Sequence, residues 1–170
     1  FRRGHPVLLR ELPSPFGHEF CGIDVATGRR VVAANSAATD DRSAPVELLN
    51  GAYAELLLVP RAIAEVNLLP VPAGLAPEVA AMVEPLACCL RGVERAGVQA
   101  GDRVAILGAG PIGLMLAACV ADAGGRAQVV GGRPERRELV PLFGGASGGG
   151  EDADVVIEAA GTDGAWQRAL

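Results

Sequence analysis

Two potential metal ligands, His18 and Glu19, stand next to each other in the stretch SPFGHEFCG near the start of the chain. Zinc accepts both imidazole nitrogen and carboxylate oxygen as ligands. Histidine and glutamate are also common on solvated loops, so the dipeptide alone favours a loop that binds nothing. A metal site at this point needs further donors from other parts of the chain.

A glycine-rich stretch, VAILGAGPIG, places Gly108, Gly110 and Gly113 between an apolar strand and an apolar helix. In a dinucleotide-binding loop the first glycine permits a sharp turn, the second lets a pyrophosphate approach the backbone, and the third lets helix and strand pack closely. Amides at the helix start, together with the helix dipole, favour the phosphate charge. The spacing predicts a dinucleotide-binding loop; a glycine turn in another strand–helix–strand protein is the alternative.

Arg133 directly follows the next predicted strand, and Arg136 and Arg137 come closely after it. An acidic residue about 20 positions past the glycines would bind the ribose hydroxyls of NAD. An arginine at this point fits the 2′-phosphate of NADP and gives a ribose diol no acceptor. The sequence therefore favours NADP over NAD. A basic, solvated helix start is the alternative, because charge runs on a surface are often no more than that.

The elements that must position these glycines and arginines alternate between strand and helix. Strands are predicted at 103–110, 126–132 and 152–162, and helices at 111–125 and 133–143. The glycine-rich stretch 144–150 is predicted to be a flexible connection. Strands that alternate with helices indicate a parallel sheet.

The first half of the chain has a different sequence pattern, and short strands are predicted there at 29–36 and 52–60. Three prolines in 66–77 predict irregular connecting chain. A helical stretch is predicted from Pro77, which suits a helix start, to Gly97, which suits a helix end. Pro85 interrupts that stretch, so two short helices or a kink are expected near Glu84.

Composition limits the possible classes of protein. Of 170 residues 50% are hydrophobic and 21% are charged, which is typical of a folding chain and not of a disordered one. The net charge of -5 argues against a nucleic-acid partner, which would require a basic face. The stretch 104–121 carries no charge, but its Gly-Ala-Gly-Pro turn favours a buried strand and helix over a membrane span.

Location and completeness are also predicted from the sequence. The chain starts at Phe1 and stops at Leu170 within a predicted helix, so we expect a piece of a longer protein. It has no secretory leader, and its four cysteines lack disulfide or CxxC spacing. We therefore expect a cytoplasmic protein with buried, unbridged thiols. Adjacent Cys88 and Cys89 point apart on a helix, so joint ligation of one metal is not expected.

Five stretches together resemble a known family, the zinc-containing medium-chain dehydrogenases, and in particular their sorbitol and threonine dehydrogenase branch. The stretches occur in family order and are FGHEFCG, GRRVVAANS, NGAYAELLLVP, VEPLACCLRGVERAGVQAGDRVAILGAGPIGLM and DVVIEAAGT. The resemblance implies an α/β protein: a partial β-rich GroES-like catalytic domain over 1–95, and a partial Rossmann doubly wound parallel sheet over 96–170.

The resemblance also implies which residues form the sites. His18, Glu19 and Glu84 would be zinc ligands, and Glu19 and Glu84 would be the catalytic carboxylates. Glu19 would be a further ligand, or a nearby carboxylate that exchanges with a ligand. The residues implied for the cofactor are Gly108, Gly110, Pro111, Ile112, Gly113, Arg133 and Gly161.

The implied function is hydride transfer between an alcohol or polyol, or its carbonyl, and NAD(P), with NADP favoured and Zn²⁺ as a Lewis acid. The alternative is a catalytically inactive dinucleotide-binding fragment of such an enzyme. A zinc-independent reductase is a third possibility, which GHE and EPLA together disfavour. The partner implied is a small alcohol or polyol, with no nucleic acid and no membrane; homo-oligomerisation of a full-length parent stays open.

The chain also departs from the family pattern. The first zinc ligand of the family, a cysteine, would lie just before Phe1, and 37–50 contains none of the four cysteines that hold a structural zinc in the family. Between LFGGAS and DADVVIE the family places a strand and a helix, where this chain has glycines. His5 is predicted to be a solvated loop residue and Trp166 a packing residue.

Overall fold

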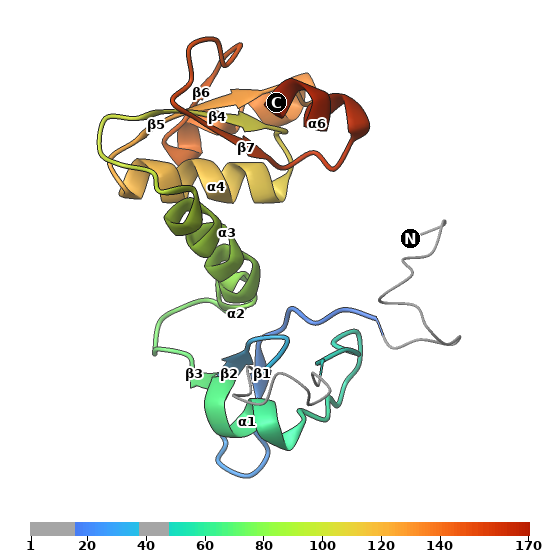
Figure 1. Ribbon diagram of the computed structural model, residues 1–170. Coiled ribbons are helices and arrows are strands. Elements are labelled where there is room, and N and C mark those ends of the chain that lie inside the picture. The colour runs from blue at the N-terminus through green and yellow to red at the C-terminus, as the bar shows by residue number, and fades with distance from the viewer. Residues whose placement is uncertain (1–15, 38–47) are drawn as a thin grey trace. The chain divides into compact units, whose positions relative to one another are not determined.

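A computed structural model describes residues 16–37 and 48–170 of the chain (Figure 1). The chain forms two compact units that divide between Glu84 and Pro85. His5 lies outside the described residues, so its expected place on a loop remains a prediction.

The first unit contains a small antiparallel sheet in the order β1-β2-β3. Its strands are β1 (Gly22–Ile23), β2 (Arg30–Ala33) and β3 (Leu68–Pro70), and α1 (Arg61–Asn67) precedes β3. The β-branched pair Val31 and Val32 suits a pleated strand and is buried. Between β1 and β2 the Asp24 carboxylate accepts hydrogen bonds from the Thr27 hydroxyl and the Ala26 N–H, which lower the pKa of Asp24.

Two expectations for the first unit are wrong. Residues 52–60 do not form a strand, and Leu56 and Leu58 are 82% and 91% exposed, because no described residue pairs with this segment in a sheet. The stretch 66–77 was expected to be irregular, but it contains β3. Pro70 is tolerated there because it is the last residue of a strand at the sheet edge.

The helical stretch divides into α2 (Pro77–Ala80) and α3 (Val83–Ala96), as the sequence predicts, but the break lies at residues 81–82 and not at Glu84. Pro85 lies in the first turn of α3, where a backbone N–H has no partner within the helix, so it does not interrupt the helix. Gly97 ends α3 with a φ of 69°. On α3, Cys88 is exposed and Cys89 is buried, so the two thiols do point apart, but the expectation of buried thiols is wrong for Cys88.

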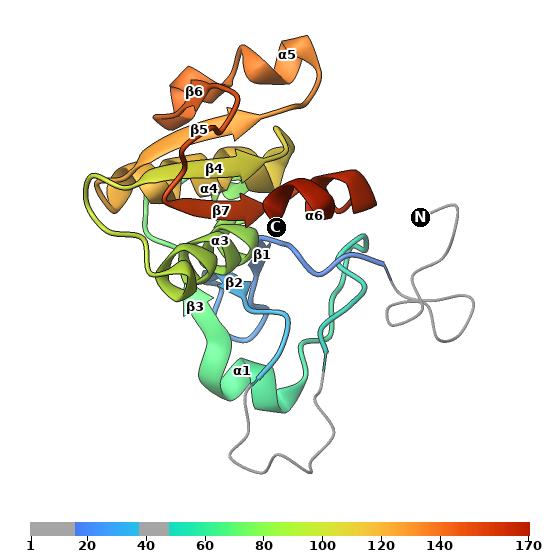
Figure 2. The ribbon, with the colours of Figure 1, turned by 45° about the horizontal axis from the view of Figure 1, so that its top comes forward.

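The second unit is built on a four-stranded parallel sheet in the order β6-β5-β4-β7 (Figures 1 and 2). Its elements are β4 (Arg103–Leu107), α4 (Pro111–Asp122), β5 (Arg126–Val130), α5 (Pro134–Arg137), a 3-10 turn (Val140–Phe143), β6 (Ala146–Ser147), β7 (Val155–Glu158) and α6 (Asp163–Ala169). This is the parallel sheet that the alternation of strands and helices predicts.

Each face of this sheet has its own apolar cluster. Val104 and Ile106 of β4 point to the face that α4 covers, whereas Ala105 and Leu107 point to the opposite face, toward Ala165 of α6. The uncharged stretch 104–121 is therefore a buried strand followed by a buried helix, as predicted. Within the described ranges no helix is both long and apolar enough to cross a membrane.

The helix predicted at 133–143 is broken into α5 and the 3-10 turn. Pro141 has no N–H for the carbonyl of Arg137 and its ring clashes with that carbonyl in an α-helix. The Ser147 hydroxyl donates to the Arg137 carbonyl instead, at 3.4 Å.

The stretch 144–150, expected to be only a flexible connection, contains the short edge strand β6. Residues 148–154 then run from β6 to β7 without a helix. The further strand and helix that the family places between LFGGAS and DADVVIE are thus both absent from these residues, and the chain there packs on the sheet. At Gly150, whose φ is 78°, an added Cβ would lie only 3.0 Å from the Ala105 Cβ.

Candidate functional site

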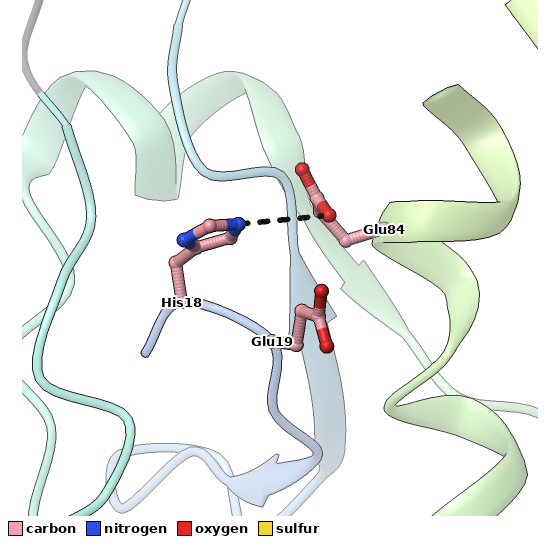
Figure 3. A group of neighbouring side chains, drawn as sticks. All are labelled: His18, Glu19 and Glu84. Atoms are coloured by element: carbon pink, nitrogen blue, oxygen red, sulfur yellow. Dashed lines mark ion pairs between the residues drawn. The ribbon is translucent and has the colours of Figure 1, made fainter. Parts of the chain in front are cut away.

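Three metal-ligand side chains meet in the first unit. His18, Glu19 and Glu84 each offer one ligand atom, and these atoms all lie within 4.8 Å of one another. Figure 3 shows the His18 ring and the Glu84 carboxylate facing each other, with Nε2 of His18 3.9 Å from Oε2 of Glu84. Glu84 is remote in sequence from the other two residues, so the fold supplies the additional donor that the His-Glu pair needs.

Backbone hydrogen bonds from residues 51–53 hold the segment that carries His18 and Glu19. The Gly17 carbonyl accepts from the N–H groups of Gly51 and Ala52 at 2.8 and 3.1 Å. The rings of Phe16 and Tyr53 are in contact, with centroids 5.0 Å apart. Gly17 has a φ of 80°, and an added Cβ would lie 2.6 Å from the Tyr53 ring, so glycine is required before His18.

Glu84 reaches the cluster from the first turn of α3. A carboxylate at this end of a helix is stabilised by the helix dipole. The Glu84 side chain is only 9% exposed and that of His18 is 28% exposed, whereas Glu19 is exposed. The cluster is therefore shielded at Glu84 and open to solvent at Glu19.

The donor set fits zinc. One imidazole nitrogen and two carboxylate oxygens are ligands of the kind found in catalytic zinc sites, which take three protein donors and keep one position open. Ligand atoms around a tetrahedral zinc lie about 3.4 Å apart. The 3.9 Å between Nε2 of His18 and Oε2 of Glu84 is close to that spacing.

The glycine loop of the second unit has the geometry that the motif predicts. Gly108 has a φ of 123° and its N–H donates to the Val130 carbonyl at 2.9 Å, which ties the loop to β5. A Cβ on Gly113 would overlap the Gly108 carbonyl oxygen, so only glycine lets α4 start this close to β4. Gly110 is the N-cap of α4, and an added Cβ there would meet only Arg136. The backbone at Gly110 is thus open to a phosphate group.

The basic residues after β5 are close to this loop. Nη1 of Arg136 lies 3.9 Å from the position of a Cβ on Gly110. Arg133 is the exposed N-cap of α5, which directly follows β5 (Figure 2). The sequence motif indicates Arg133 as the 2′-phosphate partner and gives Arg136 no separate role. The helical spacing of three residues between them is the signal that could have identified both.

The remaining residues predicted for the cofactor lie around the same edge of the sheet. Pro111 and Ile112 form the first turn of α4, and the Cys89 thiol lies 3.7 Å from the Ile112 carbonyl. Gly161 follows β7 with a φ of 66° and open space around its Cα. The fold thus gathers the glycine loop, Arg133 and Gly161 at the carboxyl ends of parallel strands, where doubly wound sheets bind their ligands. The second unit therefore has a Rossmann-type fold.

Comparison with known proteins agrees with this class, although no protein-family model matches the chain. The chain is 32% identical over 151 residues to L-galactonate-5-dehydrogenase from Escherichia coli (strain K12), covering 75% of this chain and 43% of that enzyme. It is 33% identical over 141 residues to L-threonine 3-dehydrogenase from Bacillus licheniformis, covering 69% and 39%. A solved structure assigned as a zinc-binding dehydrogenase from Sinorhizobium meliloti 1021, bound to NADP, superposes with a TM-score of 0.79 at 28% identity, covering 92% of this chain and 57% of that one.

These relatives indicate the zinc-binding medium-chain dehydrogenases, the family that the sequence motifs resemble, and the chain matches only part of them. It spans less than half the length of the two curated relatives and just over half of the solved structure. The resemblance and the Rossmann part of the fold are confirmed; the roles of individual site residues remain predictions.

Proposed function

We propose that the chain carries the metal-binding and dinucleotide-binding parts of a zinc-dependent oxidoreductase that transfers hydride between an alcohol or polyol, or its carbonyl, and NADP. One observation carries the proposal: His18, Glu19 and Glu84 converge with their ligand atoms within 4.8 Å, in a chain that also forms a dinucleotide loop. Relatives that are dehydrogenases support the reaction class.

Zinc, when bound, supplies a Lewis acid that lowers the pKa of a coordinated alcohol. In this proposal His18 provides a neutral imidazole nitrogen and Glu84 a shielded carboxylate, which fix two sides of the site. Glu19, the exposed member, provides the third ligand atom or yields its place to substrate. The glycine loop holds the pyrophosphate so that the nicotinamide can accept the hydride.

The preference for NADP rests on the arginines after β5. The Arg136 guanidinium already lies beside Gly110, and Arg133 begins the same short helix. A guanidinium binds phosphate oxygens through two parallel N–H donors. We assign the 2′-phosphate to Arg136 together with Arg133.

The substrate class in the proposal is a small hydroxyl compound, because the relatives named above are dehydrogenases of a sugar acid and of an amino acid that each carry hydroxyl groups. We further propose that the protein works in the cytoplasm, where its four thiols stay reduced.

The test has three measurements on the whole chain. Zinc content after dialysis against Zn²⁺ is compared with that of Glu84→Gln, with the exposed Glu78→Gln as the control. Binding of NADPH and NADH is followed by energy transfer from Trp166, the single tryptophan. Turnover is assayed with L-galactonate, L-threonine and simple alcohols.

One zinc per chain that is lost in Glu84→Gln, together with tighter binding of NADPH than of NADH and measurable turnover, supports the proposal. Dinucleotide binding without zinc or turnover would instead support the catalytically inactive binding fragment. Binding of neither zinc nor dinucleotide would contradict both.

A further inference from the structure

Glu158 is the last residue of β7, and the sequence analysis gave it no role. It pairs in register with Leu107, the last residue of β4, so its side chain stands at the carboxyl end of the sheet beside the glycine loop. The other residues of β7 are apolar. Glu158 is thus an acidic residue at the end of an apolar strand, and it is only partly exposed. Its carboxylate therefore needs hydrogen-bond donors from the protein.

The Glu158 carboxylate binds the backbone of the loop that follows it. Oε1 accepts hydrogen bonds from the N–H groups of Ala160 and Gly161, both at 2.7 Å. Hydrogen bonds to an ionised acceptor are shorter and stronger than neutral ones. One side chain therefore fixes two successive peptide groups of a loop whose Gly161 is in a left-handed conformation, with a φ of 66°.

The loop held by Glu158 touches the glycine loop. A Cβ on Gly108 would lie 3.0 Å from the Ala160 nitrogen and 3.1 Å from the carbonyl carbon and oxygen of Ala159. The two loops therefore pack backbone against backbone. A shift of residues 159–161 would move the wall against which the first glycine of the phosphate loop rests.

The contact between the loops after β4 and β7 lies where the order of the strands in the sheet reverses. In the order β6-β5-β4-β7 the chain proceeds from β4 to one side through β5 and β6 and then returns to the other side with β7 (Figure 2). Doubly wound sheets bind ligands in the crevice between the loops that follow these two strands. By this rule the loops after β4 and β7 would border the ligand crevice of this sheet.

We propose that Glu158 is a positioning residue for the dinucleotide: its carboxylate orders residues 159–161 before the cofactor arrives, and thereby sets the wall opposite the glycine loop. The inference rests on the proposed function, since it concerns the same dinucleotide site. A wall that is already ordered spares the cofactor the entropy cost of ordering it.

Because Glu158 is charged, a positioning role and a purely electrostatic role predict opposite effects of its removal on cofactor affinity. The pyrophosphate of the cofactor is anionic, so a carboxylate near it weakens binding by repulsion, and removing that charge alone would tighten binding. A positioning role predicts the opposite sign for a variant that removes the acceptor. Glutamine keeps an acceptor oxygen at the same reach without the charge.

The test compares the whole chain with Glu158→Ala, Glu158→Gln and the control Glu94→Ala, which removes an exposed carboxylate from α3. Affinity for NADPH is measured by energy transfer from Trp166. Amide exchange rates of residues 160 and 161 are measured by NMR without cofactor, and urea unfolding reports whether each variant is folded.

We expect NADPH binding to weaken about tenfold in Glu158→Ala, to recover most of that loss in Glu158→Gln, and to stay unchanged in Glu94→Ala. The amides of residues 160 and 161 exchange faster in Glu158→Ala and remain protected in Glu158→Gln. Unchanged or tighter binding in folded Glu158→Ala, or a Glu158→Gln variant as weak as Glu158→Ala, overturns the inference.

The outcome separates this inference from the proposed function. If the unaltered chain binds neither NADPH nor NADH, the proposed function fails, and the exchange rates of the two amides still decide whether Glu158 orders the loop. If the chain binds NADPH and only the Glu158 results are negative, the proposed function stands without this residue.

Discussion

The two units of the chain position their candidate sites by different means. In the second unit the glycine loop joins β4 to α4, which together bury a continuous apolar run in a cluster that includes Val104, Ile106 and Val120. In the first unit His18 and Glu19 lie on irregular chain held by a few backbone hydrogen bonds, over a small cluster of Ala33, Ala37, Leu49 and Ile63. The reason is that a phosphate is bound by backbone groups, whereas a metal is bound by side chains.

That difference has a consequence for mutations. Substitutions in the glycine loop change the backbone, so folding of the second unit and dinucleotide binding fall together. Substitutions in the metal cluster remove a ligand atom from a partly exposed side chain, so metal binding falls while the fold is retained. The following predictions test this contrast, from the largest expected effect to the smallest.

Gly113→Val is expected to have the largest effect. Its Cβ would overlap the Gly108 carbonyl oxygen, so β4 and α4 must separate at the cost of core packing. We expect the free energy of unfolding to fall by about 3 kcal/mol and NADPH binding to be lost. Urea unfolding and NADPH titration measure both. Gly164→Ala on α6, where an added Cβ meets nothing within 4 Å, is the matched control and should leave both unchanged.

His18→Ala should act on the metal alone. Loss of a residue that only hydrogen-bonds to a metal ligand lowers metal affinity about 10- to 100-fold. Loss of a residue that binds the metal directly should therefore lower it at least about 100-fold. Competition with a chromophoric chelator measures the zinc affinity, and urea unfolding without metal should match the unaltered chain. If His18→Ala lost much of its free energy of unfolding in the absence of metal, the metal cluster would also be needed for folding, and the contrast with the glycine loop would be wrong.

Arg136→Ala should alter the choice of cofactor without altering the fold. Loss of a charged hydrogen bond to the 2′-phosphate should weaken NADPH binding about tenfold and leave NADH binding unchanged. Parallel titrations of Arg133→Ala show how the two arginines share the phosphate, and Arg95→Ala on α3 is the control. An equal loss for NADPH and NADH would mean that Arg136 binds the pyrophosphate instead.

The ion pair between Arg103 and Asp154 predicts an acid-dependent effect in the second unit. Hydrogen bonds from the Arg103 side chain lower the pKa of Asp154 from 3.8 to about 2. Because the folded pKa is depressed, the pair stabilises the fold fully above pH 3.8 and the stabilisation is lost as the pH falls toward 2. The melting temperature of Asp154→Asn should therefore be lower than that of the unaltered chain at pH 6, and the difference should shrink as the pH falls through about 2. A difference that does not shrink between pH 3.8 and pH 2 would assign the effect to packing.

Much of the second unit is determined by the sequence itself. The uncharged run from Val104 and the glycine spacing specify a buried strand, a tight turn and a buried helix, because a backbone that must bind phosphate closely tolerates only glycine at fixed positions. The pair His18 and Glu19, by contrast, was ambiguous in the sequence, since a dipeptide does not show whether a third ligand is near.

Only the tertiary structure brings Glu84 to that pair, shows that Arg136 is beside Gly110, and reveals the loop held by Glu158 against Gly108. It also shows that 52–60, an apolar run that the sequence predicts as a strand, belongs to neither sheet of the described residues. The physical reason is common to these cases. Local patterns determine which element a stretch of chain can form, whereas a contact between distant residues, or the partner of a strand, depends on how the elements pack.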